Sequence, residues 1–167
     1  MTDEVRAVAD AIRSALPRQE EWQMQNSVPG PYRGPAPARS PASYRDFLAI
    51  ANGLICGPLV VFDAATVPKM QFYADTAAGA PVKLRADEWF CAGTVNDEPW
   101  FLHRADESVW TFPDTGVAWW MSDRFEQVAP SLERFLLDIA WGRGYPTLTG
   151  ATNDDQWWEL LQEIGRI

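Results

Sequence analysis

Few residues in this chain have side chains suited to catalysis. His103 is the only histidine, and a general base needs a nucleophile or an orienting partner, which the sequence does not place beside it. Cys56 and Cys91 lie among apolar residues, without a second cysteine or histidine at the spacing of metal ligands. No glycine-rich phosphate-binding motif occurs. We therefore expect that the protein is not an enzyme and has no catalytic residues, no cofactor and no metal site.

Asp114 is the one carboxylate that belongs to a catalytic motif. Residues 114–116 read Asp-Thr-Gly, the tripeptide of aspartic proteases, in which two aspartates share a proton because adjacent carboxylates cannot both ionise. A dimer would have to supply the second aspartate. Pro113 and the aromatic residues on either side are typical of a hairpin turn instead. A dimeric protease acting through Asp114 is therefore a remote alternative.

The acidic residues of the chain are concentrated in one stretch. The formal net charge of the 167 residues is -9, and residues 87–126 hold nine acids against two bases. Such a field repels nucleic acid and anionic membranes and attracts a cationic partner. Neither a signal peptide nor an apolar run of about 20 residues occurs. We expect a cytoplasmic protein that binds neither nucleic acid nor membrane; the residue pattern indicates no particular oligomeric state.

Apolar periodicity and capping residues predict four main helices. They span residues 3–16, 40–52, 131–141 and 154–164, the second beginning with Ser40 as its N-cap. Residues 26–41 hold five prolines and favour an extended loop. Residues 58–62 are a candidate strand, and a short helix is indicated around residues 70–78.

From residue 88 onward, the pattern changes to short strands separated by turn residues. These predicted strands cover residues 88–95, 99–105, 109–112 and 117–121. Turns this short join antiparallel neighbours, so the strands should form a meander. Helices, then a meander, then helices again predict an α+β fold in a single domain over residues 1–167.

The acidic residues fall in the predicted turns, and the topology divides them into two groups. Consecutive turns of a meander lie at opposite ends of the sheet. One acidic end should hold Asp97, Glu98 and Asp114, and the other Asp87, Glu88, Asp106, Glu107, Asp123 and Glu126. Either end could meet a basic partner, although turns also favour aspartate for their own geometry.

Aromatic residues occur on both faces of the predicted strands, because side chains alternate along a strand. Helices could cover both faces. Alternatively, some aromatic side chains stay exposed as anchors for a partner, since tryptophan and tyrosine dominate interface hot spots. The predicted partner-binding residues are Phe90, Phe101 and Trp120, together with Asp97, Glu98, Asp106, Glu107, Asp114, Asp123 and Glu126.

Four segments resemble motifs of the SUKH superfamily (SMI1/KNR4 family). Residues 44–53 resemble the family's "Y-x-x-F-L-x-x-x-N-G" helix, residues 89–93 its "W-x-x-I-G" strand, residues 108–112 its "x-V-Y-x-W" strand, and residues 128–136 its "I-A-x-S-F-x-E-F-L" helix. The segments occur in the family's order within residues 41–141. The N-terminal helix and proline-rich loop (residues 1–40) and the helical extension (residues 142–167) lie outside the match, and Leu54 stands where a second glycine is usual.

The resemblance implies a fold and a class of function. The fold would be an antiparallel sheet of four to six strands packed by helices. Bacterial members are often immunity proteins, which bind and neutralise a cognate toxin domain, frequently a nuclease. Yeast members act in cell-wall and signalling regulation, which makes an intracellular regulatory scaffold the alternative. The family motifs supply no catalytic residues, and the predicted partner is a cognate toxin protein with a basic surface.

Overall fold

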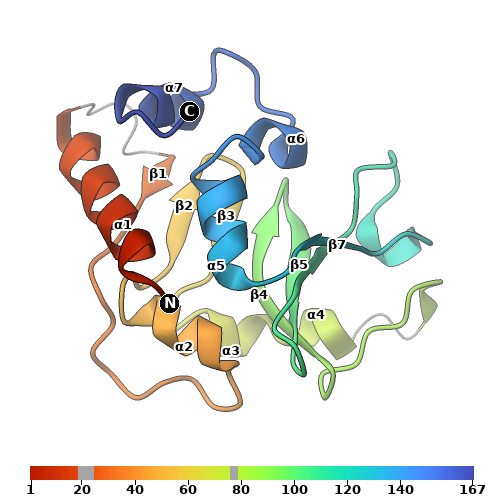
Figure 1. Cartoon of the computed structure of the whole chain (residues 1–167). Coiled ribbons are helices and arrows are strands. Elements are labelled where there is room, and N and C mark those ends of the chain that lie inside the picture. The colour runs from red at the N-terminus through yellow and green to blue at the C-terminus, as the bar shows by residue number, and fades with distance from the viewer. Residues whose placement is uncertain (19–24, 76–78) are drawn as a thin grey trace.

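An antiparallel sheet of seven strands, which follow one another in the order of the chain, forms the centre of the fold (Figure 1). The computed structural model describes residues 1–18, 25–75 and 79–167. The predicted α+β class is confirmed, with one strand more than the expected maximum of six. The strands are β1 (Asn26–Ser27), β2 (Leu54–Cys56), β3 (Leu59–Val61), β4 (Trp89–Val95), β5 (Glu98–His103), β6 (Val109–Thr111) and β7 (Glu126–Ala129).

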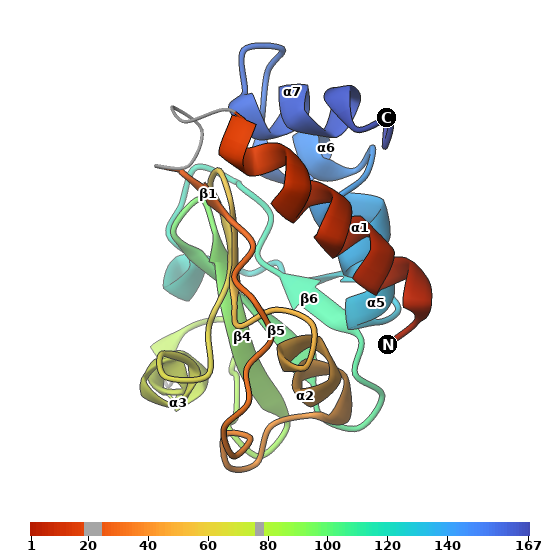
Figure 2. The ribbon, with the colours of Figure 1, turned by 90° about the vertical axis from the view of Figure 1, so that its left-hand side faces the viewer.

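Helices cover both faces of this sheet. Figure 2 shows α1, α2 and α5 on one side and α3 on the other. No helix in the described ranges is long and apolar enough to cross a membrane. The helices are α1 (Asp3–Ala15), α2 (Ala42–Leu48), α3 (Val67–Met70), α4 (Phe72–Asp75), α5 (Leu132–Arg134), α6 (Tyr145–Thr149) and α7 (Gln156–Glu163), with 3₁₀ turns η1 (Leu16–Arg18) and η4 (Trp119–Met121) and a π-helical segment η5 (Phe135–Ala140).

The predicted helices near both ends of the chain form, with shifted boundaries. α1 buries Val5, Val8 and Ile12 on one face, as its apolar period predicts. The helix predicted at residues 131–141 begins as α5 and continues as the π-helical η5. The helix predicted around residues 70–78 is replaced by the short α3 and α4, and residues 76–78 lie outside the described residues.

The N-terminus of α2 has a different cap from the predicted one. Ser40 does not cap it, because the Ser40 hydroxyl donates to the carbonyl of Pro37. The carboxylate of Glu107 accepts hydrogen bonds from the backbone N–H groups of Ala42 and Ser43, both at 2.8 Å. A turn of the sheet therefore supplies the acceptors that the first turn of a helix lacks.

The predicted strand at residues 117–121 is wrong. Residues 112–125 instead form one long connection between β6 and β7, with η4 in its middle. The connection buries Trp119 against Phe112 and Tyr73, with ring centroids 5.6 and 5.7 Å apart, while Trp120 points outward. The apolar run at residues 117–121 that predicts a strand is instead a turn in which Trp119 packs onto an aromatic cluster while Val117, Trp120 and Met121 stay exposed.

Candidate functional site

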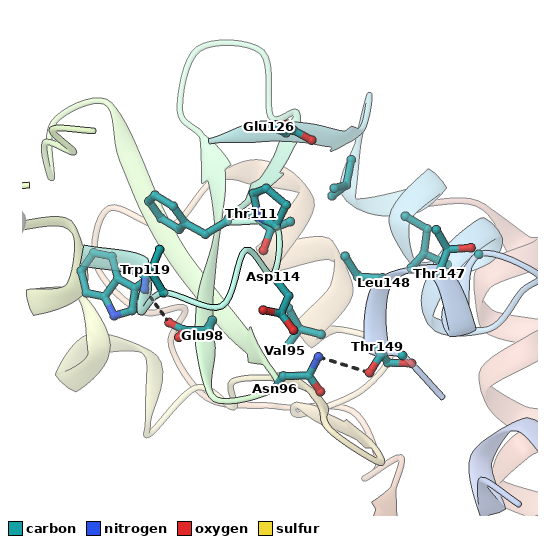
Figure 3. Close-up of a pocket in the computed structure, with 17 residues that line it drawn as sticks. Val95, Asn96, Glu98, Thr111, Asp114, Trp119, Glu126, Thr147, Leu148 and Thr149 are labelled. Atoms are coloured by element: carbon teal, nitrogen blue, oxygen red, sulfur yellow. Dashed lines mark hydrogen bonds between the residues drawn. The ribbon is translucent and has the colours of Figure 1, made fainter. Parts of the chain in front are cut away.

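A cavity of about 720 Å³ lies where β4 turns into β5, opposite α6 (Figure 3). This volume is within the range of small-ligand sites. Residues of the sheet form its floor, residues of η5 and α6 form one wall, and the connection after β6 forms the other. Its lining residues include Val95, Asn96, Glu98, Thr111, Asp114, Val117, Glu126, Val128, Ile139, Thr147, Leu148 and Thr149.

Three carboxylates line this cavity, and none of its described lining residues is basic. Glu98 is the first residue of β5, Asp114 lies in the connection after β6, and Glu126 is the first residue of β7. Thr111 pairs with Trp100 on one side and with Glu126 on the other. Side chains of paired residues lie on the same face of a sheet, so Trp100, Thr111 and Glu126 share one face. Glu98 lies on that face too, because it is two residues before Trp100 in the same strand. The sheet thus directs two of the three acids to the face that carries the cavity.

Glu98 is the most buried of the three acids. Its Oε2 accepts a hydrogen bond from the backbone N–H of Trp119 at 3.3 Å. Burial raises the pKa of its carboxyl, and the negative charges of Asp114 and Asp97 raise this pKa further, against that one hydrogen bond. A cation entering the cavity would relieve this unfavourable concentration of charge.

Asp114 lies in an exposed turn at the mouth of the cavity. Its Oδ1 accepts the backbone N–H of Gly116 at 3.0 Å, and Gly116 has a φ of 76°. An aspartate turn therefore forms here, but the predicted hairpin does not, because residues 117–121 are not a strand. Figure 3 shows the Asp114 carboxylate directed toward Glu98 and Val95. The dimeric protease stays a prediction, because it depends on a second chain.

Glu126 lies at the edge of the cavity, so the prediction that placed it at the opposite end of the sheet is wrong. It was expected beside Asp106 and Glu107, on the assumption of a strand at residues 117–121. Because that strand does not form, β7 begins at the end of the sheet where β6 finishes, opposite Thr111. Asp123 lies exposed in the same connection. Glu126 also forms an ion pair with Arg124, which partly neutralises its charge.

Thr111 is one of four polar lining residues that the sequence did not indicate, the others being Asn96, Thr147 and Thr149. It is 2% exposed, and its hydroxyl oxygen has no hydrogen-bond partner within the described structure. Figure 3 shows that hydroxyl directed into the cavity on the side of Asp114. A buried hydroxyl without a partner is unfavourable. The only sequence signal was a hydroxyl residue in a strand whose neighbour on the same face is Val109.

The acids at the other end of the sheet are engaged within the chain. Asp106 accepts hydrogen bonds from the Ser108 hydroxyl and backbone N–H, at 2.6 and 3.0 Å, and lies 3.0 Å from Nδ1 of His103. The hydrogen bonds from Ser108, with that from His103, lower the pKa of Asp106 to about 2. For Glu107, burial would raise the pKa, but hydrogen bonds from Ser43 and Ala42 outweigh it and lower the pKa.

Of the three aromatic residues predicted to bind a partner, two are buried and one is exposed. Phe90 is 2% exposed and packs on Tyr44 of α2, with ring centroids 5.1 Å apart. Phe101 is fully buried under Phe112 and Phe125 on the opposite face. The prediction that Phe90 and Phe101 are exposed anchors is therefore wrong, because helices and the connection after β6 cover both faces of the sheet.

Trp120 is the one aromatic candidate that is exposed. Its exposed fraction is 54%, and two further residues of the same connection, Val117 and Met121, are 47% and 57% exposed. Sequence reasoning missed Val117 and Met121 because it placed them in a strand. Val117 lines the cavity, and Trp120 and Met121 follow it in the same connection; we call these three exposed apolar residues the apolar rim below.

Asp97 completes the acidic end. Asn96 and Asp97 form the two-residue turn between β4 and β5, both with positive φ, and the Asn96 side chain donates to the carbonyl of Thr149 at 3.2 Å. This hydrogen bond ties the turn to the end of α6. Within the described residues, no group of three or more His, Cys, Asp or Glu side chains could hold a metal ion.

Comparison with known proteins found no relative of this chain. No protein-family model, no curated protein and no solved structure matches the chain. The resemblance of residues 41–141 to the SUKH superfamily therefore stays a prediction.

Proposed function

We propose that this chain is a non-enzymatic binding module that recognises a basic surface of another protein, acting as an immunity protein of SUKH type that neutralises a cognate toxin. The observation that carries the proposal is the acidic cavity of Glu98, Asp114 and Glu126 together with the exposed apolar rim, of which Val117 lines the cavity. Acidic and apolar groups side by side match the two requirements of a protein interface, electrostatic steering and a desolvated anchor.

The charge of the chain fits a nuclease or a similar toxin as partner. Nucleases bind phosphates through lysine and arginine, so their clefts are basic. A chain of net charge -9, whose acids concentrate in residues 87–126, would be attracted to such a cleft and would compete with the substrate for it. Asp97, exposed in the turn before Glu98, would extend the acidic surface, and Asp123 lies exposed in the same connection as Asp114.

Co-expression with toxin domains encoded beside this chain tests the proposal. The chain should restore growth and co-purify with its toxin. Trp120→Ala should weaken binding about 30-fold, the effect of about 2 kcal/mol that is typical of an aromatic hot spot. Ile55→Ala, which removes an exposed apolar side chain from β2, is the matched control and should bind like the parent chain.

Two outcomes would contradict the proposal. If no adjacent toxin is bound or neutralised, the immunity function fails. If the chain instead binds host proteins, with an affinity that survives high salt, the regulatory scaffold is the better description, because contacts dominated by charge weaken as salt screens them.

A further inference from the structure

The acidic cavity has the chemistry of a receptor for a single cationic side chain. Its acceptors come from separate segments: the Glu98 carboxylate from β5, the Asp114 carboxylate from the connection after β6, and the Thr111 hydroxyl from β6. No basic side chain is among its described lining residues. The rest of the lining is largely apolar, with Val95 and Val128 from the strands, Ile139 from η5 and Leu148 from α6.

Thr111 is the observation that goes beyond a cluster of acids. Acidic side chains at the turns of a sheet can be simply solvated, but a hydroxyl that is 98% shielded from solvent normally has a partner. Here the hydroxyl has none within the described structure, and it faces the cavity (Figure 3). A donor group that reaches this oxygen from the cavity would give it the partner it lacks, and Glu98 and Asp114 line the same cavity.

We propose that this cavity receives one arginine side chain of the protein partner, with its guanidinium between Glu98, Asp114 and Thr111; this assignment rests on the proposed function. Arginine fits better than lysine because the acceptors are spread over three side chains. A guanidinium presents five N–H donors in a planar fork, whereas an ammonium is a compact point charge. The arginine stem would lie along Val95 and Leu148, as long cationic side chains do on apolar surface.

The charge around the site favours such an occupant. The pKa of Glu98 is raised by burial and by the carboxylates of Asp114 and Asp97, so the empty cavity concentrates like charge. A guanidinium would convert that repulsion into attraction in a partly desolvated site. Glu126 is already paired with Arg124 at the rim, which leaves Glu98 and Asp114 as the principal carboxylates for the ligand.

The test uses the full chain alone and N-acetyl-arginine-N-methylamide as the probe, followed by NMR of backbone amides. Its citrulline analogue, which has nearly the same shape without the charge, and its lysine analogue are the matched controls. The arginine probe should give saturable shifts at residues 96–98 and 111–117 at concentrations on the order of 10 mM, which nearly saturate a site with a Kd of ~1 mM. The citrulline probe should give none, and the lysine probe should bind more weakly.

Variants of the cavity separate binding from folding. Glu98→Gln combined with Asp114→Asn should reduce the affinity for the arginine probe at least about tenfold, the scale of losing a charge-assisted pair. Glu159→Gln, which removes an exposed acid on α7, should leave it unchanged. Thr111→Val should reduce affinity about threefold or more while making the folded chain no less stable, since the hydroxyl it removes has no partner.

Three results would overturn the assignment: no saturable shifts with the arginine probe, equal shifts with the citrulline probe, or unchanged affinity in the double variant. Equal or tighter binding of the lysine probe would overturn the choice of arginine. Because the probe experiment needs no partner, its failure leaves the toxin-neutralisation experiment standing. A probe that binds to a chain that neutralises no toxin would instead count against the proposed function alone.

Discussion

At the scale of single residues, the carboxylates of this chain differ in the number of hydrogen bonds that they accept. Asp106 and Glu107 each accept several hydrogen bonds, which lower their pKa values and tie them to local structure. Glu98 has one backbone donor, and burial and two neighbouring acids raise its pKa. Residues kept in such unfavourable surroundings are candidates for function, because binding sites commonly reduce the stability of the free protein.

Replacing Glu98 should therefore stabilise the folded chain at neutral pH. The folded-state pKa lies above the unfolded one, so the folded state holds this proton more tightly and ionisation favours unfolding. Glu98→Gln removes the charge and keeps an oxygen that can accept from Trp119. The gain should be present at pH 7 and vanish below the ordinary glutamate pKa of about 4.3. Urea unfolding of both chains at pH 7 and pH 3 measures this gain in stability. A variant that is no more stable than the parent at pH 7 would contradict the prediction.

At the scale of elements, the sequence predicted segments with a strong period better than segments defined by tertiary contacts. The apolar stripe of α1 and the short, mostly apolar segments of β4 and β5, bounded by turn residues, carry their own signal. β1 and β2 are two and three residues long, too short for a period, and exist because they pair with neighbours. Whether residues 117–121 form a strand depends on where Trp119 packs, and local sequence does not encode that contact.

For the candidate site, likewise, the sequence predicted the residues placed by the turns of the meander but not those placed by tertiary packing. The sequence placed Glu98 and Asp114 at one end of the sheet because a meander fixes the end of each turn. It misplaced Glu126, whose position depends on the number of strands before it. The partnerless hydroxyl of Thr111 and the exposure of Val117 and Met121 follow from packing, so the pattern of residue types carried no signal for them.

Gly93 shows a constraint within β4 that can be tested. The pairing of β4 with β5 shifts register between Cys91 and Gly93, and the indole of Trp100 donates to the carbonyl of Val60 at 3.0 Å directly over Gly93. A methyl group at this position would overlap both partners of that hydrogen bond. Gly93→Ala should cost about 3 kcal/mol, at the upper end for overpacking.

Denaturant unfolding of Gly93→Ala measures this cost. Gly30→Ala is the matched control, because an added methyl group there meets nothing within 4 Å. Similar stability of the two variants would show that β4 and Trp100 can move apart without loss.

At the scale of the whole molecule, the C-terminal residues outside the SUKH resemblance are part of the same core. Trp157 of α7 is fully buried, and its indole N–H donates to the carbonyl of Ala140 at 2.7 Å. Arg166 donates to the carbonyls of Leu137 and Trp141, both at 3.2 Å. The extension therefore closes over η5, the segment that also supplies Ile139 to the acidic cavity.

Removing the Trp157 side chain should destabilise the entire chain, not only α7. Trp157→Ala should lower the free energy of unfolding by about 3–5 kcal/mol, the range for deleting a buried aromatic side chain. Trp158→Ala, at a partly exposed neighbour, is the control and should cost clearly less. Loss of α7 in a separate, earlier unfolding step would show that the extension is an independent unit.

The order of the strands also bears on how the chain folds. Each strand pairs with its neighbour along the chain, so the sheet can grow one strand at a time. The loops to close are short between β2 and β3, β4 and β5, and β5 and β6, whereas helices or long connections separate the other pairs. α1 precedes the sheet in the chain, yet two of its contacts are with distant residues: the N–H of Thr2 donates to Glu133 at 2.9 Å, and Glu4 lies 3.8 Å from Arg166. Within this chain, α1 can therefore reach these contacts only after residues 133 and 166 have been made, and its apolar face has to stay uncovered by them until then.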